Sequence, residues 1–125
     1  MRLRKVLVVD DEPEVRQVLL EFLSSRGYDV TGVSGGAEAL AIVRTLKPDL
    51  VLLDVAMPDM DGLETLKRMV SVEPALPVIM VTANADIGVT SRLLALGAVD
   101  YVPKPFDLDY LDQAVSIQVA AAQDR

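Results

Sequence analysis

Two kinds of hydrophobic pattern alternate along the chain, and this alternation limits its possible folds more than any other feature. Short runs of consecutive apolar residues are separated by segments in which apolar residues recur three and four positions apart. An unbroken apolar run is typical of a strand buried on both faces, and the wider spacing is typical of a helix with one face on a core. Parallel strands need such helices as crossover connections. The sequence therefore predicts an α/β fold with a parallel sheet.

Five segments are predicted as strands, and their hydrophobicity indicates their order in the sheet. The runs Val6–Val9, Leu50–Leu53 and Val78–Val81 are continuously apolar, whereas Val30–Val33 and Tyr101–Val102 are weaker. We expect the strong runs in the centre and the weak ones at the edges. With right-handed crossovers this gives the order 2-1-3-4-5, a doubly wound, flavodoxin-like sheet with five flanking helices.

The predicted helices lie between these strands and have recognisable start and stop residues. Gly27, Pro48 and Gly97 each follow an apolar stripe, and Asp61 with Glu64 resembles a capping box at a helix start. The five helices are expected around residues 15–23, over about Ala37–Lys47, after Asp61, over about Asp86–Leu96 and over about Leu108–Ala122.

Polar and charged side chains follow four of the five predicted strands. The carboxyl ends of parallel strands meet at one edge of the sheet, and a ligand is expected there between the first and third strands, where the winding reverses. The side chains that reach this edge are Asp10, Asp11 and Glu12 after the first strand, Asp54 after the third, Thr82 at the fourth and Lys104 after the fifth.

The carboxylates at this edge need a neutralising partner. Two carboxylates held ~4–5 Å apart repel each other by ~3–4 kcal/mol at an effective dielectric of about 20, and a whole domain is stable by only ~5–15 kcal/mol. Either one carboxyl takes up a proton, or a cation lies between them. The chain contains neither histidine nor cysteine, so a cation would have oxygen ligands, which favour Mg²⁺. Lys104 would add a second positive charge.

Such a site suits phosphoryl transfer. The transferred group carries charge on its oxygens, and a metal ion, an ammonium group and a hydroxyl group can all stabilise that charge. A carboxylate that attacks phosphorus forms an acyl phosphate, which is a known form of covalent catalysis. Asp54 is therefore the candidate nucleophile.

Composition excludes several other functions. The net charge of −7 opposes binding to nucleic acid or to an anionic membrane. The first apolar run ends at Asp10 after four residues, which is too short for a signal peptide or a membrane span. We therefore expect a cytoplasmic protein of one domain, since 125 residues is an ordinary domain size.

Four motifs, VLVVDDEPE, VLLDVAMPDMDG, VTAN and YVPKPF, occur in an order and spacing that resemble the response-regulator receiver domain of two-component signalling. The resemblance covers nearly the whole chain and implies a single receiver domain over residues 1–125. It also implies a phosphoryl donor on another protein, either a histidine kinase or a His-phosphotransfer protein, because this chain has no histidine.

The resemblance assigns roles to individual residues. It implies that Asp54 accepts the phosphoryl group, and that Mg²⁺ is held by Asp11, Asp54 and the backbone carbonyl of Ala56, with Asp10 acting through water. Thr82 would bond a phosphoryl oxygen and Lys104 would pair with another. A cis peptide bond is expected between Lys104 and Pro105.

The resemblance also predicts a switch and its output. Tyr101 would turn inward when the hydroxyl of Thr82 moves toward the phosphoryl group, and the surface of the fourth helix, fifth strand and fifth helix would then bind an output domain or protein that the sequence does not identify. Ala56 and Asn84 would modulate hydrolysis of the phosphoryl bond. Pairing of two phosphorylated chains through this surface is one alternative, although the last helix lacks alternating acidic and basic residues.

Simpler interpretations exist for each residue. Asp11 could cap the first helix ahead of Pro13, Thr82 could be an ordinary strand residue, and Lys104 could be a solvated lysine in a turn. The rival function is a metal-dependent phosphatase with an aspartyl nucleophile, of the haloacid-dehalogenase type. That class places its nucleophile after the first strand in an Asp-x-Asp motif, where this chain has Asp10-Asp11-Glu12. A flavodoxin would need hydroxyl groups and glycines in its phosphate loop instead of acids.

Overall fold

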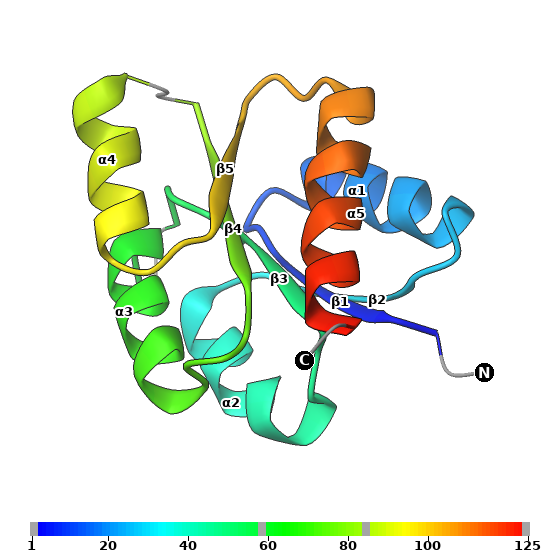
Figure 1. Cartoon of the computed structure of the whole chain (residues 1–125), viewed down its shortest axis with the longest axis horizontal. Coiled ribbons are helices and arrows are strands. Elements are labelled where there is room, and N and C mark those ends of the chain that lie inside the picture. Colours follow the sequence, from blue (N-terminus) through cyan, green and yellow to red (C-terminus); the bar gives the residue numbers. More distant parts are fainter. Residues whose placement is uncertain (1–2, 58–59, 84–85, 124–125) are drawn as a thin grey trace.

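The computed structural model describes residues 3–57, 60–83 and 86–123, and within them strands and helices alternate from end to end (Figure 1). The strands are β1 (Lys5–Val9), β2 (Asp29–Val33), β3 (Leu50–Asp54), β4 (Val78–Thr82) and β5 (Asp100–Pro103). The helices are α1 (Pro13–Ser25), α2 (Gly36–Leu46), α3 (Gly62–Val72), α4 (Ile87–Ala95) and α5 (Leu108–Gln123). The sheet is parallel in the order β2-β1-β3-β4-β5, which confirms the predicted fold class and strand order.

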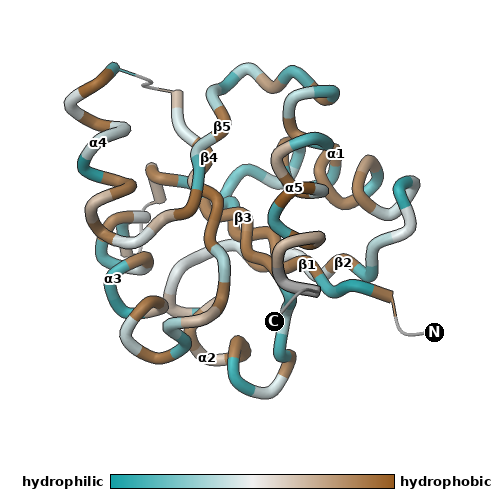
Figure 2. Tube along the Cα trace, viewed as in Figure 1, coloured by the Kyte–Doolittle hydropathy of each residue, from teal (hydrophilic) through white to brown (hydrophobic). Residues whose placement is uncertain are grey.

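The central and edge strands differ in burial as their sequences predicted. Every residue of β3 and β4 is buried, whereas β2 and β5 are partly exposed. Figure 2 shows much of β3 in the colour of hydrophobic residues, as expected for a strand covered on both faces.

Two hydrophobic cores lie on opposite faces of the sheet. Successive residues of a strand point to opposite faces, so Leu7 and Val9 enter one core and Val6 and Val8 enter the other. The first core is completed by α2, α3 and α4, and the second by α1 and α5 (Figure 1). Among the described residues, no helix is both long enough and apolar enough to cross a membrane.

The helix ends follow the predicted signals. The carboxylate of Asp61 accepts a hydrogen bond from the Glu64 amide at 2.8 Å and so caps α3, and Asp86 caps α4 in the same way through the Gly88 amide at 2.9 Å. Gly27 and Gly97 have φ angles of 91° and 113°, a conformation that glycine adopts without a steric penalty. The aspartate caps thus begin their helices, and the glycines end theirs, within a residue or two of the expected positions.

The pairing register of the strands aligns their carboxyl ends side by side along one edge of the sheet. Val9 pairs with Leu53, and Asp54 pairs with Val81. The ladder continues past the last residues, because the Lys104 amide donates to the carbonyl of Thr82 at 2.8 Å. The residues that follow β1, β3, β4 and β5 therefore gather at one edge of the sheet.

Candidate functional site

A pocket of about 260 Å³ opens at the carboxyl edge of the sheet. The residues that line it are Glu12, Asp54, Val55, Ala56, Thr82, Ala83 and Lys104. They come from the ends of β3 and β4 and from the segments that follow β1, β3, β4 and β5. The topology therefore places the pocket where a doubly wound sheet is expected to bind its ligand.

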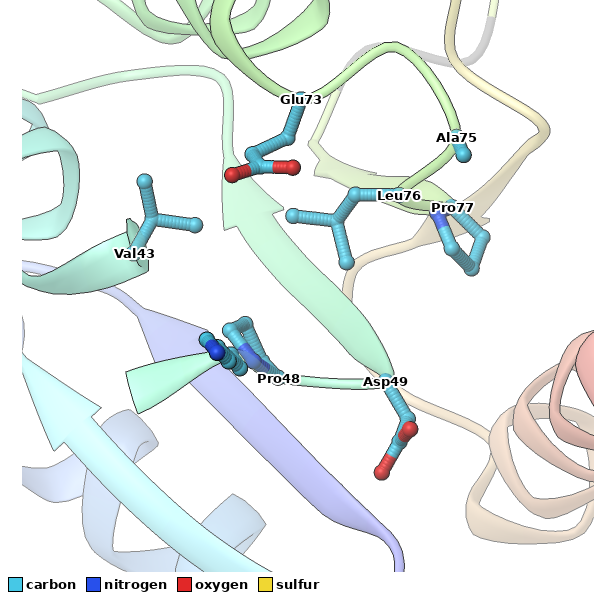
Figure 3. A pocket seen from close by; sticks show the side chains of 8 residues that line it. Val43, Pro48, Asp49, Glu73, Ala75, Leu76 and Pro77 are labelled. Carbon is cyan, nitrogen blue, oxygen red and sulfur yellow. The ribbon is translucent and has the colours of Figure 1, made fainter. Parts of the chain in front are cut away.

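A larger pocket, of about 370 Å³, lies at the other edge, before β3 and β4 (Figure 3). Val43, Pro48 and Leu76 supply part of its wall. One of its two acids, Asp49, already accepts a hydrogen bond from the Lys5 amide at 2.8 Å. Its size exceeds that of the carboxyl-edge pocket, but the convergent reactive groups lie only at the carboxyl edge among the described residues.

The ammonium of Lys104 lies among three carboxylates. Its Nζ atom is 3.3 Å from Oδ2 of Asp54, 3.4 Å from Oδ2 of Asp10 and 3.5 Å from Oε1 of Glu12. The side chains of Asp10 and Asp54 are 2% and 5% exposed, whereas that of Glu12 is 61% exposed. Two of the carboxylates are thus buried and fixed, and the third lies at the mouth of the pocket. Lys104 thus brings one positive charge to three acids, and it lies where the sequence predicted a second positive charge beside a cation.

The loop after β3 fixes Asp54. The Ala56 amide donates to Oδ1 of Asp54 at 3.3 Å, and the Gly62 amide donates to the carbonyl of Val55 at 2.7 Å. The second bond folds the start of α3 back onto the end of β3. The carboxylate of Asp54 therefore comes from a segment held at both ends.

The turn after β1 fixes Asp10 in a similar way. Its Oδ1 accepts a hydrogen bond from the Glu12 amide at 2.9 Å, and its carbonyl accepts one from Nη1 of Arg16 at 2.7 Å. These bonds tie the turn to the N-cap residue and the first turn of α1. Asp10 can therefore keep its position although its neighbours are charged.

The charges in the pocket shift the pKa values of two groups. Burial raises the pKa of Asp54 above its usual value of 3.8, and the negative charge of Asp10 raises it further, while Lys104 partly offsets both effects. Burial acts to lower the pKa of Lys104, but the carboxylates of Asp10 and Asp54 outweigh it, so this pKa is raised above 10.5. Lys104 is therefore charged at neutral pH.

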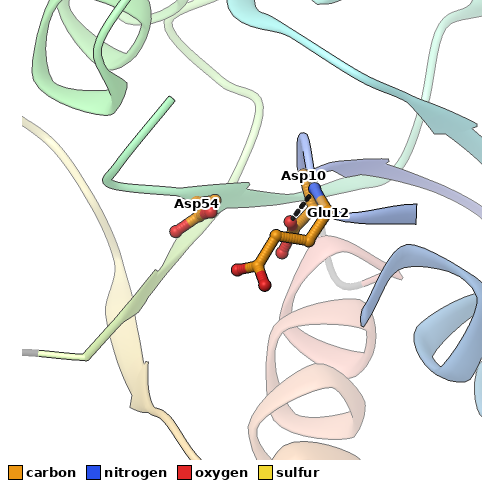
Figure 4. A group of neighbouring side chains, drawn as sticks. All are labelled: Asp10, Glu12 and Asp54. Carbon is orange, nitrogen blue, oxygen red and sulfur yellow. Dashed lines mark hydrogen bonds between the residues drawn. The ribbon is translucent and has the colours of Figure 1, made fainter. Parts of the chain in front are cut away.

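The donor atoms of the site suit a hard divalent cation. Asp10, Glu12 and Asp54 each offer a carboxylate oxygen, and these oxygens lie within 4.8 Å of one another (Figure 4). An all-oxygen, anionic donor set is the kind that Mg²⁺ and Ca²⁺ prefer, and the chain has no histidine or cysteine to favour a softer metal.

Glu12 was expected at this edge, but the sequence did not predict a role for it. Asp11, which was expected to bind the metal, is half-buried and is not one of the three clustered acids. The alternative role of Asp11 as the cap of the first helix is wrong, since Glu12 occupies that position and Pro13 begins the helix. One feature of the sequence could have indicated a role for Glu12, namely its position at the end of an acidic run directly before Pro13.

The remaining predicted residues lie as follows. Thr82 is 2% exposed and lines the pocket, as does Ala56. Tyr101 is half-buried on β5 and packs against the core formed with α2, α3 and α4. The peptide bond between Lys104 and Pro105 is cis. Asn84 lies outside the described residues.

The raised pKa of Asp54 leads to a prediction about how the thermal stability of the protein depends on pH. Because the ionised carboxylate is disfavoured in the folded state, Asp54→Asn should raise the melting temperature of the metal-free protein by a few degrees at neutral pH. The gain should fade as the pH falls to 3.8 and below, where the carboxyl is protonated in both the folded and unfolded states. Thermal unfolding at several pH values measures it. A loss of stability at neutral pH would contradict the argument.

Comparisons with known proteins agree with this architecture. A model of the response regulator receiver domain matches residues 6–116. Regulatory protein AtoC of Escherichia coli is 42% identical over 113 residues, which are 90% of this chain and 24% of that protein. Sporulation initiation phosphotransferase F of Bacillus subtilis is 40% identical over 111 residues, which are 89% of this chain and 90% of that protein. The crystal structure of a CheY-like response regulator receiver domain protein from Methanospirillum hungatei has a TM-score of 0.93 at 28% identity and covers 98% of both chains.

Proposed function

The chain belongs to the response regulator receiver domain family, and on this premise we propose that it is a phosphoacceptor module of two-component signalling whose Asp54 takes up a phosphoryl group. We assign residues 1–125 to a single receiver domain that works in the cytoplasm. The chain spans only 24% of AtoC. The family assignment therefore concerns the receiver domain alone, and what a whole protein does with this domain is a proposal.

One observation carries the proposal: Asp54, Thr82 and Lys104 line the same pocket, and the Lys104 ammonium lies 3.3 Å from the Asp54 carboxylate. A carboxylate oxygen of Asp54 would attack phosphorus, and the bond from phosphorus to the donor's leaving group would break with its electron pair on that group. The hydroxyl of Thr82 would donate to one phosphoryl oxygen and Lys104 would pair with another. A phosphorus atom in this pocket would thus be surrounded by the carboxylate of Asp54, the hydroxyl of Thr82 and the ammonium of Lys104.

The acids at the pocket support a role for Mg²⁺. Asp11, Asp54 and the carbonyl of Ala56 would hold the ion, and Asp10 would act through a water molecule. When bound, the ion would offset the charge on the phosphoryl oxygens. Ala56, at the pocket wall, and Asn84 would influence how fast water hydrolyses the phosphoryl bond.

The phosphoryl donor would be a second protein. Because the chain has no histidine, a phosphohistidine must come from a histidine kinase or a His-phosphotransfer protein. The net charge of −7 would repel the phosphates of nucleic acids and anionic membranes, so we propose that the domain binds neither directly.

The switch would link the pocket to the surface of α4, β5 and α5. Thr82 would move toward the phosphoryl group and Tyr101 would turn further inward. A change of a few kcal/mol in the balance between two states is enough to invert their populations. Several apolar side chains of these elements and of the turn before β5 are exposed and would be available to an output partner, namely Ile87, Leu94, Val99, Tyr110 and Ile117. That partner would be a linked domain, a separate protein or a second copy.

Incubation of the purified chain with acetyl phosphate and Mg²⁺ tests the proposal. We expect a stoichiometric phosphoryl adduct by intact-mass spectrometry, which is stable in acid and is lost in base, as an acyl phosphate should be. Omission of Mg²⁺ should slow its formation. The absence of an adduct would contradict the proposal, and steady turnover of a phosphomonoester would favour a phosphatase instead.

A further inference from the structure

Glu12 has an unusual position for a residue at a helix start. It is the N-cap residue of α1, yet its side chain makes no capping hydrogen bond. Its carboxylate points instead toward the pocket (Figure 4), where Oε1 lies 3.5 Å from the ammonium of Lys104. The backbone of Glu12 is held in this orientation because its amide donates to Asp10 at 2.9 Å. Helix capping therefore does not explain this carboxylate.

The three acid partners of Lys104 are not equivalent. The carboxylates of Asp10 and Asp54 are buried. In the proposed function Asp54 would bind the divalent cation directly, and Asp10 would bind it through a water molecule. A cation near these carboxylates would repel the ammonium strongly, because both positive charges would occupy the same small and partly buried space. Lysine has a long flexible stem, so its ammonium can move outward. Glu12, which is 61% exposed, is the partner that lies on the solvent side.

We propose that Glu12 is a positioning residue for Lys104, which keeps the ammonium at the mouth of the pocket when a divalent cation binds to Asp54 and, through water, to Asp10. This inference rests on the proposed function, in which the pocket binds Mg²⁺. Without the Glu12 carboxylate, a displaced ammonium would lose its remaining acid partner. It would therefore compete more strongly with the cation for Asp10 and Asp54.

A double-mutant cycle on Mg²⁺ affinity tests this role, because binding is measured without any phosphorylation. The full chain and the variants Glu12→Gln, Lys104→Gln and Glu12→Gln/Lys104→Gln are titrated with Mg²⁺ at low ionic strength, by calorimetry and by the NMR shift of the Val55 amide. We expect Glu12→Gln to weaken Mg²⁺ binding about two- to fivefold when Lys104 is present, the range of an exposed ion pair. In the Lys104→Gln background the same change should alter the affinity by less than about 1.5-fold.

The controls separate the possible failures. Glu14→Gln removes an equally charged, exposed acid two residues away and should leave the affinity unchanged. An equal weakening by Glu12→Gln in both backgrounds would overturn the proposal, because Glu12 would then act directly on the ion. No weakening in either background would overturn it as well. A wild-type chain that binds no Mg²⁺ would defeat the proposed metal site itself, and the positioning role with it. Thermal unfolding checks that each variant is folded, and Lys104→Met replaces Lys104→Gln if it is not.

Discussion

Asp54→Asn is expected to lower the rate of phosphoryl transfer from acetyl phosphate by more than about 100-fold, to the background of the mass measurement. The amide is close to the carboxylate in shape, so it should keep the end of β3 in place. It lacks the negative charge that makes a carboxylate oxygen a nucleophile toward phosphorus. The variant should still fold, and its expected gain in stability without metal would show that a lost adduct does not reflect a lost structure.

Two further variants locate the adduct. Asp61→Asn changes the exposed cap of α3, which is in the same loop, and should be phosphorylated like the wild type. Asp10→Asn removes a buried carboxylate 3.4 Å from the Lys104 ammonium and should slow the reaction without abolishing it. An Asp54→Asn chain that acquires the adduct as fast as the wild type would show that another residue is the acceptor.

Strand ends were predictable because they depend on short-range patterns. The apolar runs that form β1, β3 and β4 each stop at the residue where the polar group of the site begins, so Asp10, Asp54 and Thr82 were assigned to one edge from spacing alone. Burial on both faces makes a slipped register costly, which is why these assignments agree with the structure. The edge strand β5 is shorter and half exposed, yet the turn after it still brings Lys104 to the same place.

Side-chain partners across the pocket could not be predicted in the same way. Whether Asp11 or Glu12 turns toward Asp54 depends on the backbone between β1 and α1, where the Glu12 amide bonds Asp10 and Arg16 bonds the Asp10 carbonyl. The reach of Lys104 to three carboxylates depends on a flexible stem that no periodic pattern describes. The half-buried position of Tyr101 likewise follows from how α4 packs beside β5.

The loop after Asp54 depends on a glycine for a reason that the sequence did not reveal. A Cβ atom at Gly62 would collide with the backbone carbonyl of Asp54 and would lie 2.8 Å from the carbonyl oxygen of Val55. The collision is with backbone, which cannot rotate away as a side chain can. The hydrogen bond from the Gly62 amide to Val55 requires this close approach. The start of α3 and the end of β3 that carries Asp54 are therefore packed together without room for a methyl group.

Gly62→Ala is accordingly expected to destabilise the protein by about 2–4 kcal/mol and to slow phosphorylation at Asp54, although every reactive side chain remains. The loop must move outward to admit the methyl group, and the end of β3 that carries Asp54 must move with it. Denaturant unfolding and the rate of adduct formation measure the two effects. Gly88→Ala is the matched control, since among the described residues a Cβ there meets only Oδ1 of Asp86, at 3.3 Å. Alanine in a helix should leave stability unchanged or raise it by up to ~1 kcal/mol. If Gly62→Ala unfolded and reacted like Gly88→Ala, the close packing of α3 on β3 would not be what holds Asp54 in place.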